Sequence, residues 1–121
     1  MVNPVSWSFT VKPVNDSIYE LHFAATIEPS WHMYSQFVPE GGPMPAVFTF
    51  TPANNYKKID GVKEVTKPTK EFDNMFNMDV SFFALDAKFV QKIKVLSKES
   101  FKITGGIEYQ VCDDHECAPC N

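Results

Sequence analysis

The sequence alternates apolar and polar residues over much of its length, and this period of two is the feature that most limits the possible folds. Apolar residues occupy every second position in residues 5–11, and again in residues 19–27. Successive side chains of a β-strand point to opposite faces, so the pattern predicts strands with one buried face. No segment has a convincing helical period of 3.6 residues. The sequence therefore predicts an all-β fold.

Turn residues divide the chain into about eight short strands, and this spacing favours an immunoglobulin-like antiparallel β-sandwich, with a small barrel as the alternative. The expected strands cover residues 5–11, 18–27, 31–37, 46–51, 56–59, 62–65, 80–83, 87–95 and 101–111. The pair Gly105 and Gly106 suggests a bulge or bend inside the last of them.

Residues 67–78 have no clean period and are expected to form a loop. This stretch contains Phe72, Met75, Phe76 and Met78. A loop that carries four large apolar side chains is expected to cover another part of the molecule.

The length of 121 residues corresponds to one domain, residues 1–121. The net charge is −4, and all eleven basic residues other than histidine are lysines. A nucleic-acid-binding surface usually has a basic stripe with arginine, so nucleic acid is not expected as a partner. No apolar run is long enough for a membrane-spanning helix, and no signal peptide begins the chain. We expect a soluble domain excised from a larger exported protein, because the chain stops within its cysteine-rich stretch.

The three cysteines all fall within the last ten residues. Such clustering closes small loops that add little stability, so it favours chemistry over a structural role. One possibility is thiol–disulfide exchange: Cys112 and Cys117 are separated by four residues, and their sulfurs can meet. Cys117 and Cys120 also form a C-x-x-C motif. We do not expect a thioredoxin fold, because that fold places the motif at the start of a helix and one residue follows Cys120.

The second possibility is a non-catalytic sandwich that binds a soft metal, zinc or copper. Four potential ligands, Cys112, His115, Cys117 and Cys120, lie within nine residues. That is compact for a structural zinc site, whose ligand pairs are usually a dozen or more residues apart. Both chemistries remain open at this point. A weaker third alternative is an adhesion-type sandwich whose cysteines pin one end.

The cysteine motif resembles the N-terminal periplasmic domain of the DsbD family of thiol:disulfide interchange proteins. In that family a Tyr-Gln-x-Cys strand end is followed by a second cysteine and a proline-containing turn. Here the order is Tyr109, Gln110, Val111, Cys112, and then Cys117, Ala118, Pro119.

Further stretches of the sequence carry the same resemblance. Residues 31–34 (Trp-His-Met-Tyr) look like the family's aromatic strand beside the active site, and residues 73–76 (Asp-Asn-Met-Phe) look like its cap loop. The strand expected at residues 88–95 precedes the cysteine strand, as it does in the family. The likeness extends from Trp7 to Pro119.

The resemblance implies an immunoglobulin-like sandwich with the redox cysteines and a cap loop at one end. It implies that Cys112 and Cys117 are the catalytic redox pair, with Cys117 entering the mixed disulfide and Cys112 resolving it. The cap loop would consist of Asp73, Asn74, Met75 and Phe76. Residues near the active site would be His32, Tyr34, Tyr109, His115 and Pro119.

The resemblance also implies a function. As a protein-disulfide reductase, the domain would sit in the periplasm as part of an inner-membrane protein. It would take electrons from the membrane domain and a thioredoxin-like C-terminal domain of its parent. It would pass them to periplasmic disulfide isomerases or to thioredoxin-like proteins of cytochrome c maturation. It would need no cofactor and no metal, because the cysteine pair carries the two electrons.

The sequence departs from the family pattern in three places. Cys120 stands where the family commonly has a second proline. The paired cysteines are one residue closer than in the enterobacterial form. The family's last strand would follow Asn121, so we expect a truncated final strand, with the fold either completed by a neighbour or left with an open edge.

Overall fold

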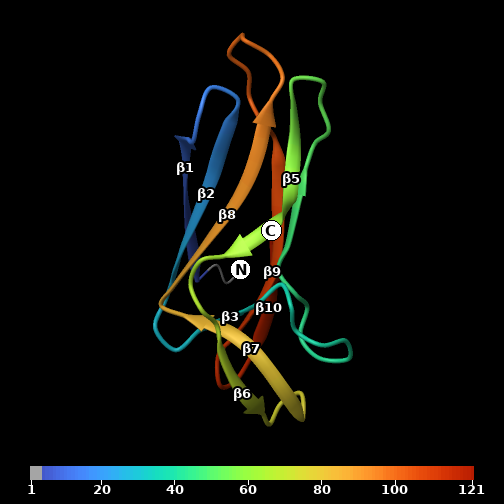
Figure 1. Ribbon diagram of the computed structural model, residues 1–121. Coiled ribbons are helices and arrows are strands. Elements are labelled where there is room, and N and C mark those ends of the chain that lie inside the picture. Colours follow the sequence, from blue (N-terminus) through green and yellow to red (C-terminus); the bar gives the residue numbers. More distant parts are fainter. Residues whose placement is uncertain (1–3) are drawn as a thin grey trace.

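The computed structural model describes residues 4–121, which form ten strands in two facing sheets (Figure 1). No helix occurs in this part of the chain. The first sheet has the strand order β1 (Val5–Pro13), β2 (Ile18–Ile27), β8 (Asp86–Val95), β5 (Tyr56–Glu64). The second has the order β10 (Cys117–Cys120), β9 (Gly105–Cys112), β3 (His32–Tyr34), β7 (Met78–Ala84), β6 (Thr69–Asp73), and β4 (Val47–Phe50) also pairs with β9. Every pairing is antiparallel, so the expected immunoglobulin-like sandwich is confirmed.

The core lies between the sheets and is built by the period-two pattern. In β8, Ala87, Phe89, Gln91 and Ile93 are buried, and the residues between them are exposed or partly buried. Phe89 is fully buried and packs against Phe48 and Phe83, with ring centroids 4.9 and 5.4 Å apart. This aromatic packing stabilises the two sheets against each other.

The expected strands differ from the observed ones in the middle of the chain. Residues 56–59 and 62–65, expected as two strands, form the single strand β5, with a register shift between Ile59 and Lys63. Asp60 has φ of 59° at this irregularity. The buried Gln91 amide donates to the carbonyls of both Ile59 and Asp60, at 3.1 Å each. The side chain thus satisfies backbone groups that the shift removes from the ladder.

Three further expectations were wrong. Residues 69–73 are the edge strand β6, although we expected residues 67–78 to be entirely loop. The aromatic strand is shorter than residues 31–37, because β3 covers His32–Tyr34. The last expected strand begins at residue 105 and not at residue 101, so Gly105 and Gly106 open β9, in regular register with Phe50 and Thr49 and without a bulge. A Cβ at Gly105 would lie 2.0 Å from the Thr49 carbonyl oxygen, which explains a glycine at this position.

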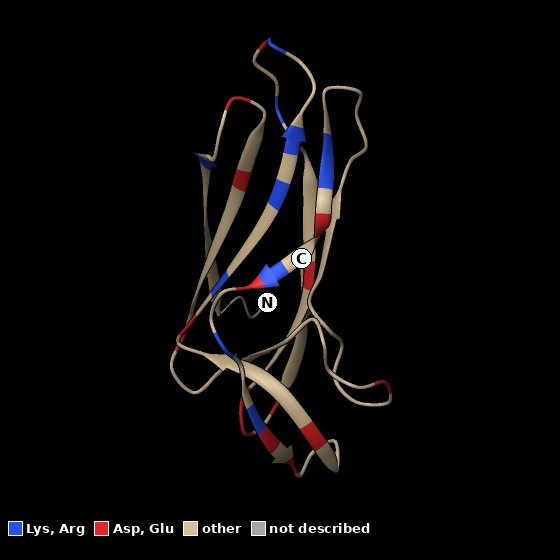
Figure 2. Cartoon of the chain, viewed as in Figure 1, with Lys and Arg blue, Asp and Glu red and all other residues tan. Residues whose placement is uncertain are grey.

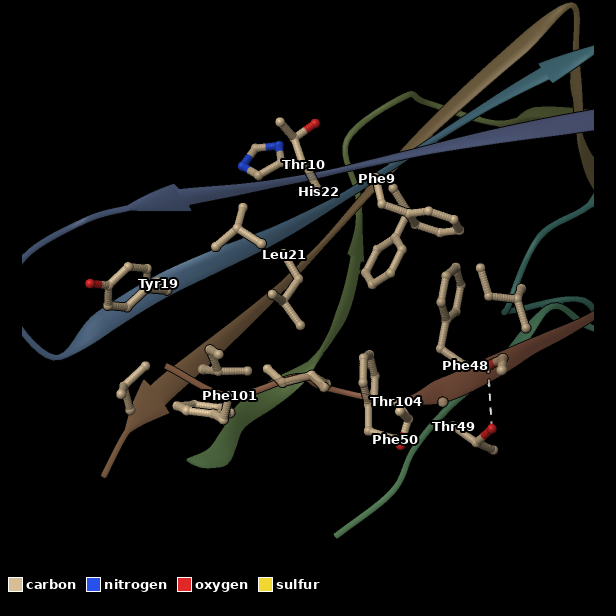
Figure 3. A pocket seen from close by; sticks show the side chains of 18 of the residues that line it. Phe9, Thr10, Tyr19, Leu21, His22, Phe48, Thr49, Phe50, Phe101 and Thr104 are labelled. Atoms are coloured by element: carbon tan, nitrogen blue, oxygen red, sulfur yellow. Dashed lines mark hydrogen bonds between the residues drawn. The ribbon is translucent and has the colours of Figure 1, made fainter. Parts of the chain in front are cut away.

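A cavity of about 920 Å³ opens between the layers at the end remote from β6. Figure 3 shows aromatic and aliphatic side chains of β1, β2 and β4 around it. The labelled apolar residues are Phe9, Tyr19, Leu21, Phe48, Phe50 and Phe101.

Candidate redox site

Cys112 and Cys117 are joined by a disulfide between the last residue of β9 and the first residue of β10. The two residues are direct cross-strand partners, and their Cα atoms are 4.0 Å apart. Four residues connect the strands. In this turn the Asp113 carboxylate accepts hydrogen bonds from the backbone N–H groups of His115 (2.8 Å) and Glu116 (2.7 Å). These donors lower the pKa of Asp113. The turn therefore brings the two cysteines face to face.

The third cysteine is a free thiol that lies apart from this disulfide. Cys120 is three residues beyond Cys117 on the same strand, so its side chain lies on the opposite face of the sheet. It pairs with Tyr109 across the ladder and packs against the main core, whereas Cys117 packs against a separate cluster around Tyr34. Burial raises the pKa of the Cys120 thiol. The C-x-x-C spacing therefore does not bring its two sulfurs together here.

The residues expected to form the cap loop lie in the β6–β7 connection and contact the disulfide through Met75. Asp73 ends β6, and its carboxylate Oδ1 accepts hydrogen bonds from the backbone N–H groups of Met75 (2.7 Å) and Phe76 (3.1 Å). This turn places the Met75 Sδ atom 3.4 Å from the Sγ atom of Cys117. A disulfide sulfur has no proton to donate, so this is a van der Waals contact between sulfur atoms. Met75 is otherwise 52% exposed, so the shield over the disulfide is thin.

Tyr34 ties the cap loop to the sheet below it. Its hydroxyl donates to Asp73 Oδ2 at 3.4 Å, and its ring meets Phe76 edge-on at 6.0 Å. Burial, together with the negative charge of Asp73 and the hydrogen bond to it, raises the pKa of Tyr34 to about 12. The phenol therefore stays neutral over the physiological range and holds the carboxylate that shapes the cap.

A cavity of about 280 Å³ lies beside Cys112. His32, which is the cross-strand partner of Cys112, stacks on Phe82 with ring centroids 4.1 Å apart and forms one wall. Four acidic residues also line the cavity: Glu71, Asp73, Asp113 and Asp114. Several negative charges are thus close to the place where sulfur chemistry would occur.

The other expected neighbours lie in different places. His115 is exposed at the tip of the 113–116 turn. Pro119 is exposed on β10, opposite Gln110. Tyr109 does not line the cavity beside Cys112. It is buried in the main core, with its ring centroid 5.6 Å from that of Trp7, and burial raises its pKa.

Sequence reasoning assigned no role to Gln110, although it is the site's most direct polar contact. Its amide Nε2 donates to Cys112 Sγ at 3.7 Å, and its Oε1 accepts from the backbone N–H of Met44 at 2.7 Å. The alternation of side chains along β9 carried the signal, because residues 110 and 112 share one face of a strand.

No group of three or more His, Cys, Asp and Glu residues among residues 4–121 is arranged to hold a metal ion. Cys112 and Cys117, two of the four ligands considered for a metal site, are bonded to each other instead. The structure therefore gives no support to the soft-metal alternative. Within the same residues there is also no helix with the length and apolar character needed to cross a membrane.

The protein is thus a β-sandwich with a cross-strand disulfide at one end, beside the cap loop. It falls in the class of domains that carry a disulfide in a position suited to thiol chemistry. The family model of the N-terminal domain of thiol:disulfide interchange protein DsbD matches residues 2–121. The chain therefore belongs to this family, which supports its assignment as a thiol:disulfide interchange domain. A search of curated proteins found no match.

Proposed function

We propose that this domain relays electrons by thiol–disulfide exchange through Cys112 and Cys117, as a periplasmic protein-disulfide reductase domain of a membrane protein. The observation that carries the proposal is the cross-strand disulfide held under a thin cap in a chain of the DsbD N-terminal family. The electron donor is a thioredoxin-like domain of the parent protein. The acceptors are thioredoxin-like disulfide isomerases or cytochrome c maturation proteins.

Reduction of the domain begins with attack on the sulfur that a partner can reach. Cys112 is 4% exposed, whereas Cys117 is only partly buried. The side chain that lies against Cys117 is that of Met75, and methionine side chains are flexible. A donor thiolate attacks Cys117 Sγ, the Cys112–Cys117 bond breaks, and Cys112 leaves as a thiolate. The donor's second thiolate then attacks the mixed disulfide. This step releases the oxidised donor and leaves two electrons, and after protonation two protons, on Cys112 and Cys117.

Transfer to the acceptor reverses these steps. The Cys117 thiolate attacks the acceptor's disulfide, and the leaving sulfur of the acceptor takes up a proton. The Cys112 thiolate then attacks Cys117 Sγ in the mixed disulfide. The Cys112–Cys117 bond forms again and the acceptor leaves as a dithiol, so electrons and protons balance.

Differential alkylation with mass mapping across a graded glutathione redox buffer tests the proposal. We expect Cys112 and Cys117 to convert together and reversibly, at a potential between about −270 and −120 mV, the range of known oxidoreductases. Cys120→Ser is the control variant and is expected to leave that potential unchanged. A pair that glutathione cannot reduce, or a Cys117–Cys120 bond in the oxidised protein, would refute the proposed function.

A further inference from the structure

Cys112 must carry a full negative charge whenever it leaves as a thiolate, and it does so in a buried position. Burial away from water destabilises a charged sulfur. Four acidic residues, Glu71, Asp73, Asp113 and Asp114, line the adjoining cavity, and their negative charges oppose that charge further. His32 and Tyr34 of β3 face the same cavity. A thiolate at this site therefore needs a nearby hydrogen-bond donor.

The amide of Gln110 is placed to be that donor. Among the side chains of residues 4–121, its Nε2 group makes the one hydrogen bond that a sulfur of the pair accepts. The Met44 N–H group, 2.7 Å from Oε1, fixes the orientation of the amide, because an N–H donor requires the oxygen to face it. The Nε2 group is therefore held toward Cys112 before any charge develops.

We propose that Gln110 is a catalytic residue of the exchange reaction, which stabilises the Cys112 thiolate through its Nε2–H group. This inference rests on the proposed function and adds a residue to it. The hydrogen bond is long in the disulfide state because a neutral sulfur is a weak acceptor. It strengthens when Cys112 becomes anionic, since hydrogen bonds to charged groups are roughly twice as strong as neutral ones. The donor thus favours the state that forms during bond cleavage over the disulfide that precedes it.

Two substitutions separate the donor from the anchoring role of the same side chain. Gln110→Met removes both hydrogen bonds and keeps the side chain's size. Gln110→Glu keeps an oxygen for the Met44 N–H and replaces the donor with a carboxylate oxygen. Gln36→Met is the matched control, because Gln36 is a partly buried glutamine whose amide donates to the Val62 carbonyl at 3.1 Å.

The first measurement is the rate of disulfide reduction by dithiothreitol under native conditions. We expect about tenfold slower reduction for Gln110→Met, from the loss of one hydrogen bond to a charged group, and a greater loss for Gln110→Glu. Gln36→Met is expected to react at the unsubstituted rate. A slower rate in Gln110→Glu but not in Gln110→Met would overturn the proposal, because added charge alone would then explain it.

The second measurement is the pH profile of iodoacetamide alkylation at Cys112, in a Cys117→Ser, Cys120→Ser background where Cys112 is the single thiol. Gln110→Met is expected to move the midpoint of this profile upward by about one pH unit. A purely structural role would lower the unfolding midpoint and leave the profile in place, which would overturn the proposal. A disulfide that no thiol reduces in the unsubstituted protein would instead refute the proposed function itself.

Discussion

The two ends of the sandwich differ in what fills the space between the layers and in their charge. At one end, Cys112 and residues of the cap loop line a small cavity of about 280 Å³. At the other end the cavity is larger, about 920 Å³, and many aromatic rings line it. In Figure 2 acidic residues mark β7 and the 113–116 turn and lie beside a lysine on β6, whereas the opposite end has lysines on β5 and β8 together with acidic residues in its turns.

Under the proposed function, the chemistry lies beside the smaller cavity and not at the larger one. Thiol–disulfide exchange needs access to one sulfur and a leaving group that can hold charge, and neither requires a wide pocket. The end with the disulfide brings these features together through the 113–116 turn, the cap loop and the Gln110 amide. The end with the larger cavity and the core next to it contribute aromatic packing instead. We therefore expect stability and reactivity to depend on different parts of the molecule.

The largest expected effect is on stability, from Phe89→Ala. Phe89 is 0% exposed and packs against three aromatic rings, so its truncation is expected to cost about 3–5 kcal/mol of unfolding free energy. Phe9→Ala is the control, because Phe9 is 65% exposed and its loss is expected to cost less than about 1 kcal/mol. Urea denaturation of the oxidised protein measures both values.

The same denaturation series compares the core with the redox end. The disulfide closes a short loop of sequence separation 5, so Cys117→Ser is expected to cost about 2 kcal/mol. If Cys117→Ser lowered the free energy of unfolding more than Phe89→Ala does, stability would depend mainly on the redox end. That result would contradict the expectation that stability and reactivity depend on different parts of the molecule.

The charge difference between the ends predicts how thiols of different charge react. We expect cysteamine to reduce the disulfide about three- to tenfold faster than 3-mercaptopropionate at low ionic strength, after correction for thiol basicity. The carboxylates beside Cys112 attract the ammonium group and repel the carboxylate. High salt is expected to remove most of the difference. Stopped-flow kinetics under both conditions measure it.

Neutral variants at each end locate the origin of this preference. Glu71→Gln with Asp114→Asn removes two carboxylates from the cavity beside Cys112 and is expected to weaken the preference. Asp16→Asn with Glu99→Gln changes the same charge on exposed residues of two turns at the other end and is expected to leave it intact. An equal change in both double variants would show that net charge, not the acidic end, steers the thiol.

A smaller kinetic effect is expected from Met75→Ala. The substitution removes the sulfur that lies against Cys117, so a small thiol is expected to reduce the disulfide a few times faster. Stability is expected to change little because Met75 is half exposed. Met44→Ala is the control: it truncates another exposed methionine and retains the backbone hydrogen bond to Gln110. Unchanged kinetics in Met75→Ala would show that the cap does not limit access.

The strands that the sequence predicted well are those with one strongly apolar face. The pattern of β8 marked its buried positions directly, and in β2 it marked Leu21, Ala25 and Ile27. The prediction of a buried face was wrong for most of β1, where Val5 is buried but Phe9 and Val11 are exposed. β6 was missed because four of its five residues are exposed, so it has no apolar face to reveal it. Its pairing with β7, a tertiary interaction, makes it a strand.

The sequence likewise predicted one part of the candidate site and missed another. The sequence pointed to both cysteines and, through the family resemblance, to the cap residues. The pairing of Cys117 with Cys112 or with Cys120 and a metal alternative remained open until the disulfide and the register of β9 and β10 were known. The strand β10 was not expected, because Cys117–Cys120 is short and contains Pro119. The role of Gln110 depends on the Met44 backbone, which lies 66 residues away in the sequence. A contact between residues so far apart in the sequence leaves no recognisable pattern in the sequence around either of them.

The smallest expected effect concerns Tyr34, which links the cap to the sheet. Its pKa is raised from 10.0 to about 12, so between these values the unfolded chain loses the phenolic proton before the folded protein does. The unfolded state then binds fewer protons, and stability is expected to fall as the pH rises through this window. Below pH 10 the contribution is fully present. Tyr34→Phe is expected to make this fall less steep, with a loss of about 0.5–1 kcal/mol at neutral pH from the missing hydrogen bond.

Urea midpoints across a pH series measure this effect, and Tyr109→Phe provides the comparison within the same protein. Burial also raises the pKa of Tyr109, but its hydroxyl lies in the main core and does not touch the cap. Both substitutions are expected to reduce the alkaline slope, whereas Tyr34→Phe alone is expected to speed reduction of the disulfide, because Asp73 loses its link to β3. If Tyr109→Phe speeds reduction equally, the two ends of the molecule are coupled through the core and the division between them does not hold.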